Sequence, residues 1–217
     1  MEKVLLTGFE PFAGAHHNPS GVIAREVART WSGPGHVVAE VLPVEFERAP
    51  DALTAALERH RPDAVVALGL ADGRTGITVE KVAINTVDAS IADNAGRQLT
   101  DVPVIASGPT AYFSTLPIKA MVNAMRDQGV AAAVSYSAGT FVCNQIFYVL
   151  RHALEHTQIP AGFVHVPNDA ATARPDAPGE PRPWIPRDAQ VAALTAALRV
   201  VMERRGADAT TVGGALH

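Results

Sequence analysis

The sequence of 217 residues contains a single cysteine, Cys143, and no long apolar run. One cysteine cannot form a disulfide within the chain, so nothing in the sequence indicates an oxidising compartment. A membrane-spanning helix needs about 18 consecutive apolar residues, and no window of the sequence reaches that length. The apolar stretch VLLTGFEPF near the start is too short for the central region of a signal peptide. These absences predict a cytoplasmic protein that does not enter a membrane.

An excess of basic residues is also lacking. The chain has 18 Lys and Arg residues against 22 Asp and Glu residues, which gives a formal net charge of −4. This balance argues against nucleic acid as a partner, because such proteins usually present a basic face. A hydrophobic content of 47% with 18% charged residues is typical of a globular protein, and the length suffices for one domain with a large core.

Short apolar runs alternate with helical patterns along the whole chain. The strands are expected at 3–8, 37–43, 64–69, 77–87, 131–136 and 161–166. The helices are expected at 18–31, 47–60, 115–128, 141–156 and 187–204, with a polar excursion at 88–108 and a proline-rich loop at 167–186. This alternation predicts an α/β fold: a three-layer α/β/α sandwich around a mostly parallel (mixed) twisted sheet. We expect one catalytic domain over residues 1–205 and a frayed tail over 206–217.

Cys143 is the first candidate for chemistry. It lies in the first turn of the predicted helix 141–156, directly after the small-residue turn 138–140. The partial positive charge at a helix start stabilises a thiolate and lowers the thiol pKa. A strand, a turn and a helix that present a nucleophile are also the plan of the hydrolase elbow, although GxSxG is absent here. A buried structural thiol is the alternative, because free cysteine is among the most buried residue types.

A thiol nucleophile needs a base, and His165 is the candidate among eight histidines because it lies at the end of an apolar strand. A satisfied core histidine is the alternative at that position. Glu80 lies within the apolar alternation ITVEKVAIN, where an unpaired carboxylate would be costly. It could orient an imidazole as the third member of a triad, or pair with Lys81 or Arg74 at the surface.

Histidines also raise the question of a metal. His152 and His156 are four residues apart on a predicted helix, a spacing that could bind a metal ion. No third ligand accompanies them in the sequence. Surface positions are therefore the expected explanation for both histidines, and we expect no metal site. We also expect no cofactor.

Four segments in a fixed order are similar to a known family. They are TGFEPFAG with NPS, GITVEKVAIN, STLPIKAM with AGTFVCN, and GFVHVPN, and they span residues 7–168. Through them the chain resembles the pyroglutamyl peptidases, cysteine peptidase family C15. The resemblance implies that Cys143 is the nucleophile, that His165 is the general base and that Glu80 orients this base. It also implies removal of an N-terminal pyroglutamyl residue from peptides through an acyl-enzyme, without a metal, by a cytoplasmic homo-oligomer (dimer or tetramer).

The substrate that this resemblance implies has a small, uncharged lactam ring, so its pocket should be apolar with a few polar contacts. The residues expected to bind it are Phe9, Phe12, Asn18, Leu70, Ile91, Phe141 and Val142. Phe9 and Phe12 are similar to the aromatic wall of the family, although core packing is their alternative role. Asn18 and the backbone near Leu70 and Ala71 could form hydrogen bonds with the lactam.

Two positions depart from the family pattern. Ser90 stands where an arginine is common, and Leu70 stands where many members carry glutamine. Arg74 or Arg97 could take over the role of the missing arginine. Two other functions stay open at this stage: a thiol-dependent amidase for other small lactams or amides, and a catalytically weakened relative that acts as a binding protein.

Overall fold

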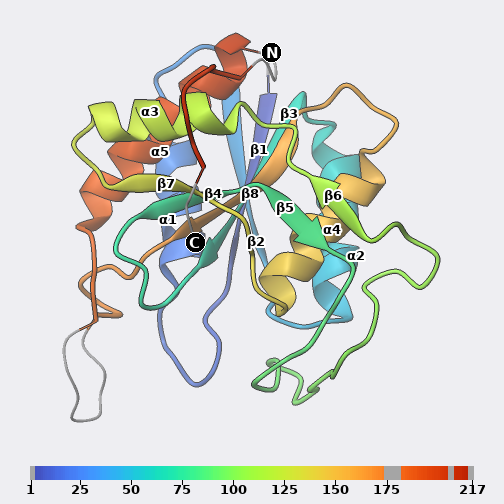
Figure 1. Cartoon of the computed structure of the whole chain (residues 1–217). Helices are drawn as coiled ribbons and strands as arrows, with labels where there is room; N and C mark the ends of the chain where they lie inside the picture. Colours follow the sequence, from blue (N-terminus) through green and yellow to red (C-terminus); the bar gives the residue numbers. More distant parts are fainter. Residues whose placement is uncertain (1–2, 174–181, 205–207, 215–217) are drawn as a thin grey trace.

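Six strands form the main sheet, in the order β2-β1-β3-β8-β4-β7 (Figure 1). The structure is a computed structural model and describes residues 3–173, 182–204 and 208–214; residues 174–181 of the predicted proline-rich loop lie outside this part. The strands are β1 (Lys3–Phe9), β2 (His36–Leu42), β3 (Ala64–Leu70), β4 (Ile77–Glu80), β7 (Ala132–Ser135) and β8 (Ala161–Val166). Neighbouring strands are parallel except β4 and β8, which pair antiparallel.

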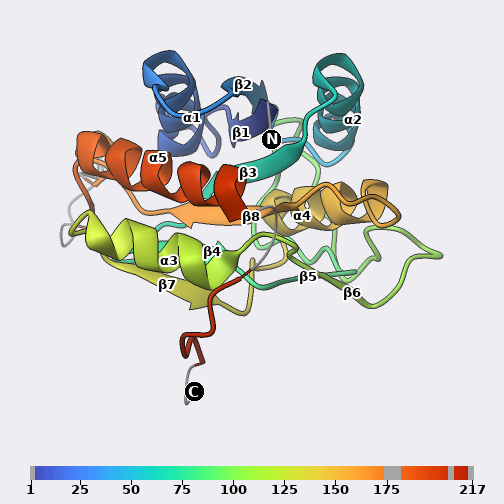
Figure 2. The same ribbon diagram turned by 90° about the horizontal axis from the view of Figure 1, so that it is seen from above.

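Helices cover both faces of this sheet (Figure 2). One face carries α1 (Pro19–Thr30), α3 (Ile118–Asp127) and α5 (Arg187–Arg204), and the other carries α2 (Arg48–His60) and α4 (Val142–Ala153). A buried apolar cluster lies under each helical layer. The central strand β3 contributes alternate residues to both clusters, as expected of a strand buried on both faces. The predicted three-layer α/β/α sandwich with a mostly parallel, mixed sheet is confirmed.

The predicted strand 77–87 is instead two strands in two different sheets. β4 ends at Glu80, and β5 (Val82–Ile84) pairs with β6 (Ala111–Phe113) in a separate antiparallel ribbon. Lys81 is the point of division, because its N–H donates to Ser135 of the main sheet while its carbonyl accepts from Ser114 beside the ribbon. Alternation alone does not show where a chain changes its pairing partner, so the sequence predicts one continuous strand.

Part of the predicted tail contacts the domain. The carboxylate of Asp208 accepts the backbone N–H groups of Lys119 at 2.9 Å and Ala120 at 3.0 Å, at the start of α3. The residue before α3 is a proline and forms no side-chain cap, so the first N–H groups of this helix need an acceptor from elsewhere. Residues 208–214 are thus attached where the sequence alone predicts fraying, and 206–207 and 215–217 lie outside the described residues.

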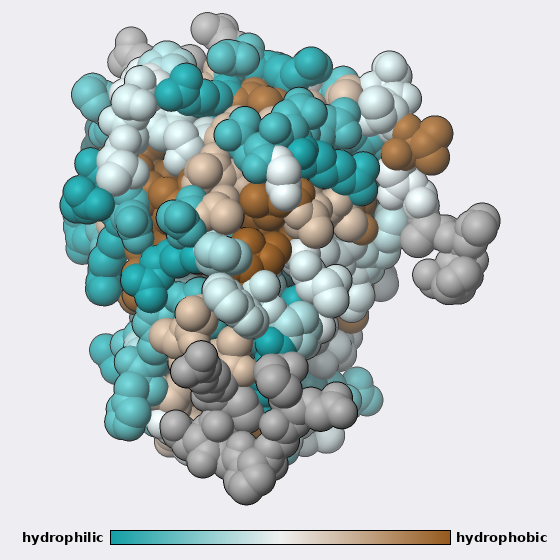
Figure 3. Space-filling view, turned by 90° about the vertical axis from the view of Figure 1, so that its left-hand side faces the viewer, coloured by the Kyte–Doolittle hydropathy of each residue, from teal (hydrophilic) through white to brown (hydrophobic). Residues whose placement is uncertain are grey.

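The surface of the helical layers is mixed in character. Figure 3 shows the side of the molecule that faces left in Figure 1, where hydrophilic residues dominate and hydrophobic ones form small groups between them. In the part of the chain that the structure describes, none of the helices combines the length and the hydrophobicity that a membrane crossing requires.

Candidate active site

The thiol of Cys143 lies at the amino-terminal end of α4, above the end of β3. The helix begins at Val142, and its cap residue Phe141 forms no side-chain hydrogen bond with the first turn. A methyl carbon added at Gly69 would lie 2.7 Å from Sγ of Cys143, so the sulfur rests directly on the glycine backbone. Gly69 is in turn the register partner of His165 on the neighbouring strand β8. The strand pairing therefore places the thiol and the imidazole over the same point of the sheet.

His165 and Glu80 form a buried hydrogen bond. Nδ1 of His165 lies 2.7 Å from Oε1 of Glu80, and the two side chains are 5% and 0% exposed. His165 pairs with Thr78 across the antiparallel β4–β8 ladder, which places Glu80 on the same face two residues further along. The antiparallel pairing of β4 and β8 thus places Glu80 diagonally opposite His165, close enough for the two side chains to form this hydrogen bond.

Arg74 contacts Glu80 as well. Its Nη1 lies 2.7 Å from Oε1 of Glu80 and also donates to Oγ1 of Thr78, and its Nη2 donates to the carbonyl of Ser137 at 3.1 Å. The same carboxylate oxygen of Glu80 therefore contacts both the imidazole and the guanidinium, and the pair with Arg74 is buried on the Glu80 side and does not lie at the surface. Sequence reasoning considered Arg74 only as a surface partner or a substitute.

The two arginines that could replace the missing family arginine lie in different places. Arg74 lines the pocket that contains Cys143, whereas Arg97 pairs with Glu47 and is outside it. Ser90 is exposed. Of the two candidates, only Arg74 brings a positive charge to the thiol.

The pKa shifts describe a thiol and an imidazole that are both neutral at rest. Burial, together with the charge of Glu80, raises the pKa of the Cys143 thiol to about 12, and Arg74 opposes this rise. Burial lowers the pKa of His165, and the hydrogen bond and charge of Glu80 offset this only in part. The sequence predicts a lowered thiol pKa from the helix start, but the direction is opposite because burial outweighs the partial charge.

Glu80 keeps its charge in this setting. Burial alone would raise its pKa, but the hydrogen bond to His165 and the charge of Arg74 lower it below the usual value. Its second oxygen, Oε2, is buried and has no hydrogen-bond partner among the described residues. A charged carboxylate facing Nδ1 favours the imidazole tautomer with its proton on Nδ1, which leaves Nε2 free to act as a base.

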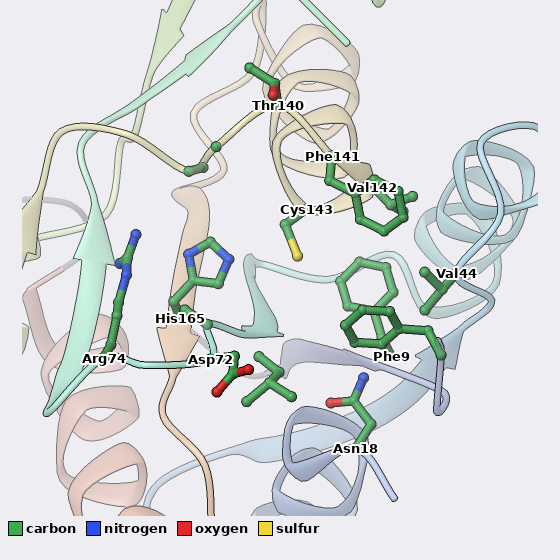
Figure 4. Close-up of a pocket in the computed structure, with 15 residues that line it drawn as sticks. Phe9, Asn18, Val44, Asp72, Arg74, Thr140, Phe141, Val142, Cys143 and His165 are labelled. Carbon is green, nitrogen blue, oxygen red and sulfur yellow. The ribbon is translucent and has the colours of Figure 1, made fainter. Parts of the chain in front are cut away.

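A pocket of about 320 Å³ lies beside this group (Figure 4). The sulfur of Cys143 points into it, with the His165 ring on one side and the ring of Phe9 on the other (Figure 4). Six of the seven predicted substrate-binding residues line it: Phe9, Phe12, Asn18, Leu70, Phe141 and Val142. Ile91 does not; it is 41% exposed and lines an adjoining hollow instead.

Asn18 has less freedom to bind a ligand than the sequence suggests. As the predicted N-cap of α1, its Oδ1 accepts from the backbone N–H and the hydroxyl of Ser20. Its Nδ2 donates to the carbonyl of Glu10 at 2.9 Å, which leaves one N–H of the amide unengaged. The N–H and the carbonyl of Ala71 also have partners, in Val166 and Arg74. The unengaged N–H of Asn18 and the backbone of Leu70 are the predicted polar contacts that remain for a lactam.

A polar turn behind the pocket was not predicted to support the site. Asp93 accepts the backbone N–H of Phe46 at 2.8 Å, and the Phe46 ring packs edge-on against Phe141 with 5.2 Å between centroids. The next residue, Asn94, donates to the carbonyl of Pro11 at 2.9 Å. The Asp-Asn-x-Gly pattern at 93–96 predicts a turn but not the loops it joins. Sequence reasoning also missed the pocket residues Val44, Asp72, Ala138, Gly139 and Thr140.

The contact between Gly69 and the thiol can be tested by adding a methyl group. In Gly69→Ala the new carbon would lie 2.7 Å from Sγ of Cys143 and 2.8 Å from the Phe163 ring, so one of these side chains must move. We expect kcat/KM for a pyroglutamyl amide, the substrate class that the resemblance implies, to fall about 10²-fold, because a reacting group would be misplaced. Gly214→Ala is the matched control, because no described residue other than its chain neighbours lies within 4 Å of its added carbon. Equal activity of the two variants would contradict the placement of the thiol.

Comparisons with known proteins identify the family of the chain. The family model described as pyroglutamyl peptidase matches residues 2–204. A pyrrolidone-carboxylate peptidase of Clavibacter michiganensis is 47% identical over 203 residues, which cover 93% of each chain. One from Escherichia fergusonii is 46% identical over 220 residues, which cover both chains completely.

Solved structures show the same likeness. The crystal structure of pyroglutamyl peptidase I from Bacillus amyloliquefaciens has a TM-score of 0.89 at 37% identity and covers 94% of this chain and 98% of its own. The pyrrolidone carboxyl peptidase from Thermococcus litoralis has a TM-score of 0.90 at 37% identity, with 98% and 99% of the two chains covered. The family model, the curated relatives and the solved structures all match this chain along almost its whole length. The chain therefore belongs to the pyroglutamyl peptidase family and is a cysteine peptidase, a hydrolase of that type.

Proposed function

We propose that the protein removes the N-terminal pyroglutamyl residue from peptides through a thioester, with Cys143 as nucleophile, His165 as general base and Glu80 orienting His165. The observation that carries this proposal is the buried 2.7 Å contact between Glu80 and His165 beside a pocket that also contains the only thiol of the chain. In the described residues no hydrogen bond joins the sulfur to the imidazole, which suits a neutral pair that becomes active only when substrate is bound.

The first step forms the thioester. As Sγ of Cys143 attacks the carbonyl carbon of the pyroglutamyl residue, the thiol proton moves to Nε2 of His165. The uncapped N–H groups at the start of α4 stabilise the oxyanion. The imidazolium then gives its proton to the leaving nitrogen, the C–N bond breaks, and the shortened peptide departs with a free amino group.

The second step returns the enzyme to its resting state. His165 accepts a proton from water while the water oxygen attacks the thioester carbonyl carbon. The C–S bond breaks, the proton returns to sulfur, and pyroglutamate is released. Glu80 stays ionised throughout and stabilises the imidazolium that forms in both steps.

Selectivity follows from the character of the pocket. Phe9, Phe12 and Phe141 give it an aromatic, uncharged wall, and Phe9 is only 3% exposed. The charged lining residues Asp72 and Arg74 are already paired, with Arg182 and Glu80. An N-terminal glutamate would bring an ammonium and a carboxylate against this wall without partners, whereas the cyclic lactam carries neither charge. We therefore expect the cyclised residue to be strongly preferred.

A release assay tests the proposed function. The purified protein is given the pyroglutamyl amide of a fluorescent arylamine, with the glutaminyl and prolyl amides in parallel. We expect cleavage of the pyroglutamyl compound alone. Cleavage of the glutaminyl amide at a similar rate would favour a broader amidase, and failure to cleave the pyroglutamyl compound would overturn the proposal.

The assembly and the location of the protein stay predictions. We expect a cytoplasmic homo-oligomer, either a dimer or a tetramer. The antiparallel ribbon β5–β6 offers exposed apolar side chains for such a contact, since Phe113 is 65% and Ile84 is 36% exposed. A monomer in light scattering at micromolar concentration would contradict this expectation.

A further inference from the structure

A second hollow of about 610 Å³ adjoins the pocket of Cys143. The two share Phe12, Leu70 and Asp72, so they meet at the segment that directly follows Gly69. Asp72 lies across the pocket from the Cys143 sulfur (Figure 4). The hollow is therefore open to a ligand that already occupies the first pocket.

The direction of the substrate chain follows from the proposed function, on which this inference rests. The leaving nitrogen must lie beside His165, because His165 protonates it. At the other end of the first pocket, Phe9 and Val44 are buried and close the space. A peptide that continues beyond the cleaved bond therefore has its way out past Leu70 and Asp72, into the second hollow.

Asp72, which lines both cavities, forms an ion pair with Arg182. Oδ1 of Asp72 accepts from Nδ2 of Asn168 at 2.8 Å, and Oδ2 accepts from Nη1 of Arg182. Asn168 is 1% exposed and its backbone carbonyl accepts from Nε2 of Gln190, which fixes the position of this residue beside Asp72. Arg182 is 47% exposed at its side chain, and among the described residues its Nε and Nη2 have no hydrogen-bond acceptor. The guanidinium is thus held by Asp72 with donors left for a ligand.

We propose that the second hollow binds the leaving part of the peptide and that Arg182 favours substrates with a carboxylate just after the pyroglutamyl residue. Among the described lining residues, Asp72 is the one acidic side chain, and its charge is met by Arg182. The second carboxylate near the hollow, Asp169, is buried and already contacts His17 and Arg187. A ligand carboxylate would meet the free guanidinium donors without an unpaired acid beside it. The carboxylate could belong to an acidic side chain or to the C-terminus of a dipeptide.

Charge reversal at Arg182 tests this inference. We would compare wild-type and Arg182→Glu proteins on an uncharged pyroglutamyl arylamide and on pyroglutamyl-glutamyl and pyroglutamyl-lysyl peptide amides. Pyroglutamyl-alanine and its amide form a second arm that isolates the C-terminal carboxylate. Arg59→Glu is the control, because Arg59 also pairs with a carboxylate, Glu40, but lines neither cavity.

We expect wild type to have a higher kcat/KM for the substrate that carries the carboxylate in at least one of the two comparisons. The comparison that shows this preference tells whether the carboxylate is that of an acidic side chain or that of the C-terminus. Arg182→Glu should lower kcat/KM for that substrate about tenfold, because attraction becomes repulsion, and leave the arylamide within about twofold. An equal loss on all substrates, or no change on any, would overturn the inference. A wild-type protein that cleaves none of these substrates overturns the proposed function and this inference with it, whereas one that cleaves them without favouring a carboxylate in either arm overturns this inference alone.

Discussion

Replacing Cys143 with serine is expected to lower kcat/KM for a pyroglutamyl amide on the order of 10⁴-fold or more, the scale seen when a nucleophile is removed. A hydroxyl is a far weaker acid than a thiol, and burial lowers the pKa of His165, so this imidazole is a weak base for serine. The measurement is a steady-state assay of the purified variant beside wild type. The change removes one sulfur and adds one oxygen in the same place, so the fold should persist.

The single thiol makes the control direct. Wild type is treated with a thiol-alkylating reagent and its intact mass is followed. Because Cys143 is the only cysteine, the mass of one added alkyl group reports on this residue alone. Activity of wild type should fall in step with that mass change, and free pyroglutamate should slow both. A thermal unfolding midpoint of Cys143→Ser close to wild type would show that the fold is intact. Full activity in this folded variant would exclude Cys143 as the nucleophile and would require another one.

The sequence predicts the elements of the fold well because most of them carry a local signal. The helix at 187–204 has the bounds found for α5, and Asn18-Pro19 marks the start of α1 through a cap that the structure shows. The division of 77–87 at Lys81 has no such signal, since it depends on hydrogen bonds to Ser135 and Ser114, far along the chain. Long-range pairing is the part of the fold that alternation leaves undetermined.

The same limit applies to the site. Cys143, His165 and Glu80 stand out because each is a reactive or charged side chain in an apolar or helix-start setting. Arg74 and Asp72 lie in an ordinary polar turn, and only the tertiary structure brings them to the pocket. The pKa of the thiol also depends on burial by the whole domain, which the helix start does not reveal. The local sequence pattern therefore identifies the reactive side chains, whereas tertiary packing sets their pKa values and their contacts.

Glu80→Gln is expected to lower kcat/KM on the order of 10²–10⁴-fold and to move the acid limb of its pH profile to lower pH. The carboxylate fixes the imidazole tautomer and stabilises the imidazolium, and an amide does neither reliably. Burial lowers the pKa of His165, while the hydrogen bond and charge of Glu80 raise it. Removing Glu80 leaves burial unopposed, so the pKa falls further and the neutral base persists into more acidic solution. The wild-type limb itself should lie below the ordinary histidine pKa.

Glu40 offers a matched control for this change, because its Oε1 also contacts a histidine and an arginine, His60 at 2.6 Å and Arg59 at 2.8 Å. Glu40 is 28% exposed and lies outside both cavities, so Glu40→Gln should keep its activity and its pH profile. If Glu40→Gln keeps its activity, then loss of a carboxylate that pairs with a histidine and an arginine does not by itself slow the enzyme. An acid limb that moves to higher pH, or does not move while the rate falls, would mean that Glu80 acts through packing and not through the charge of His165.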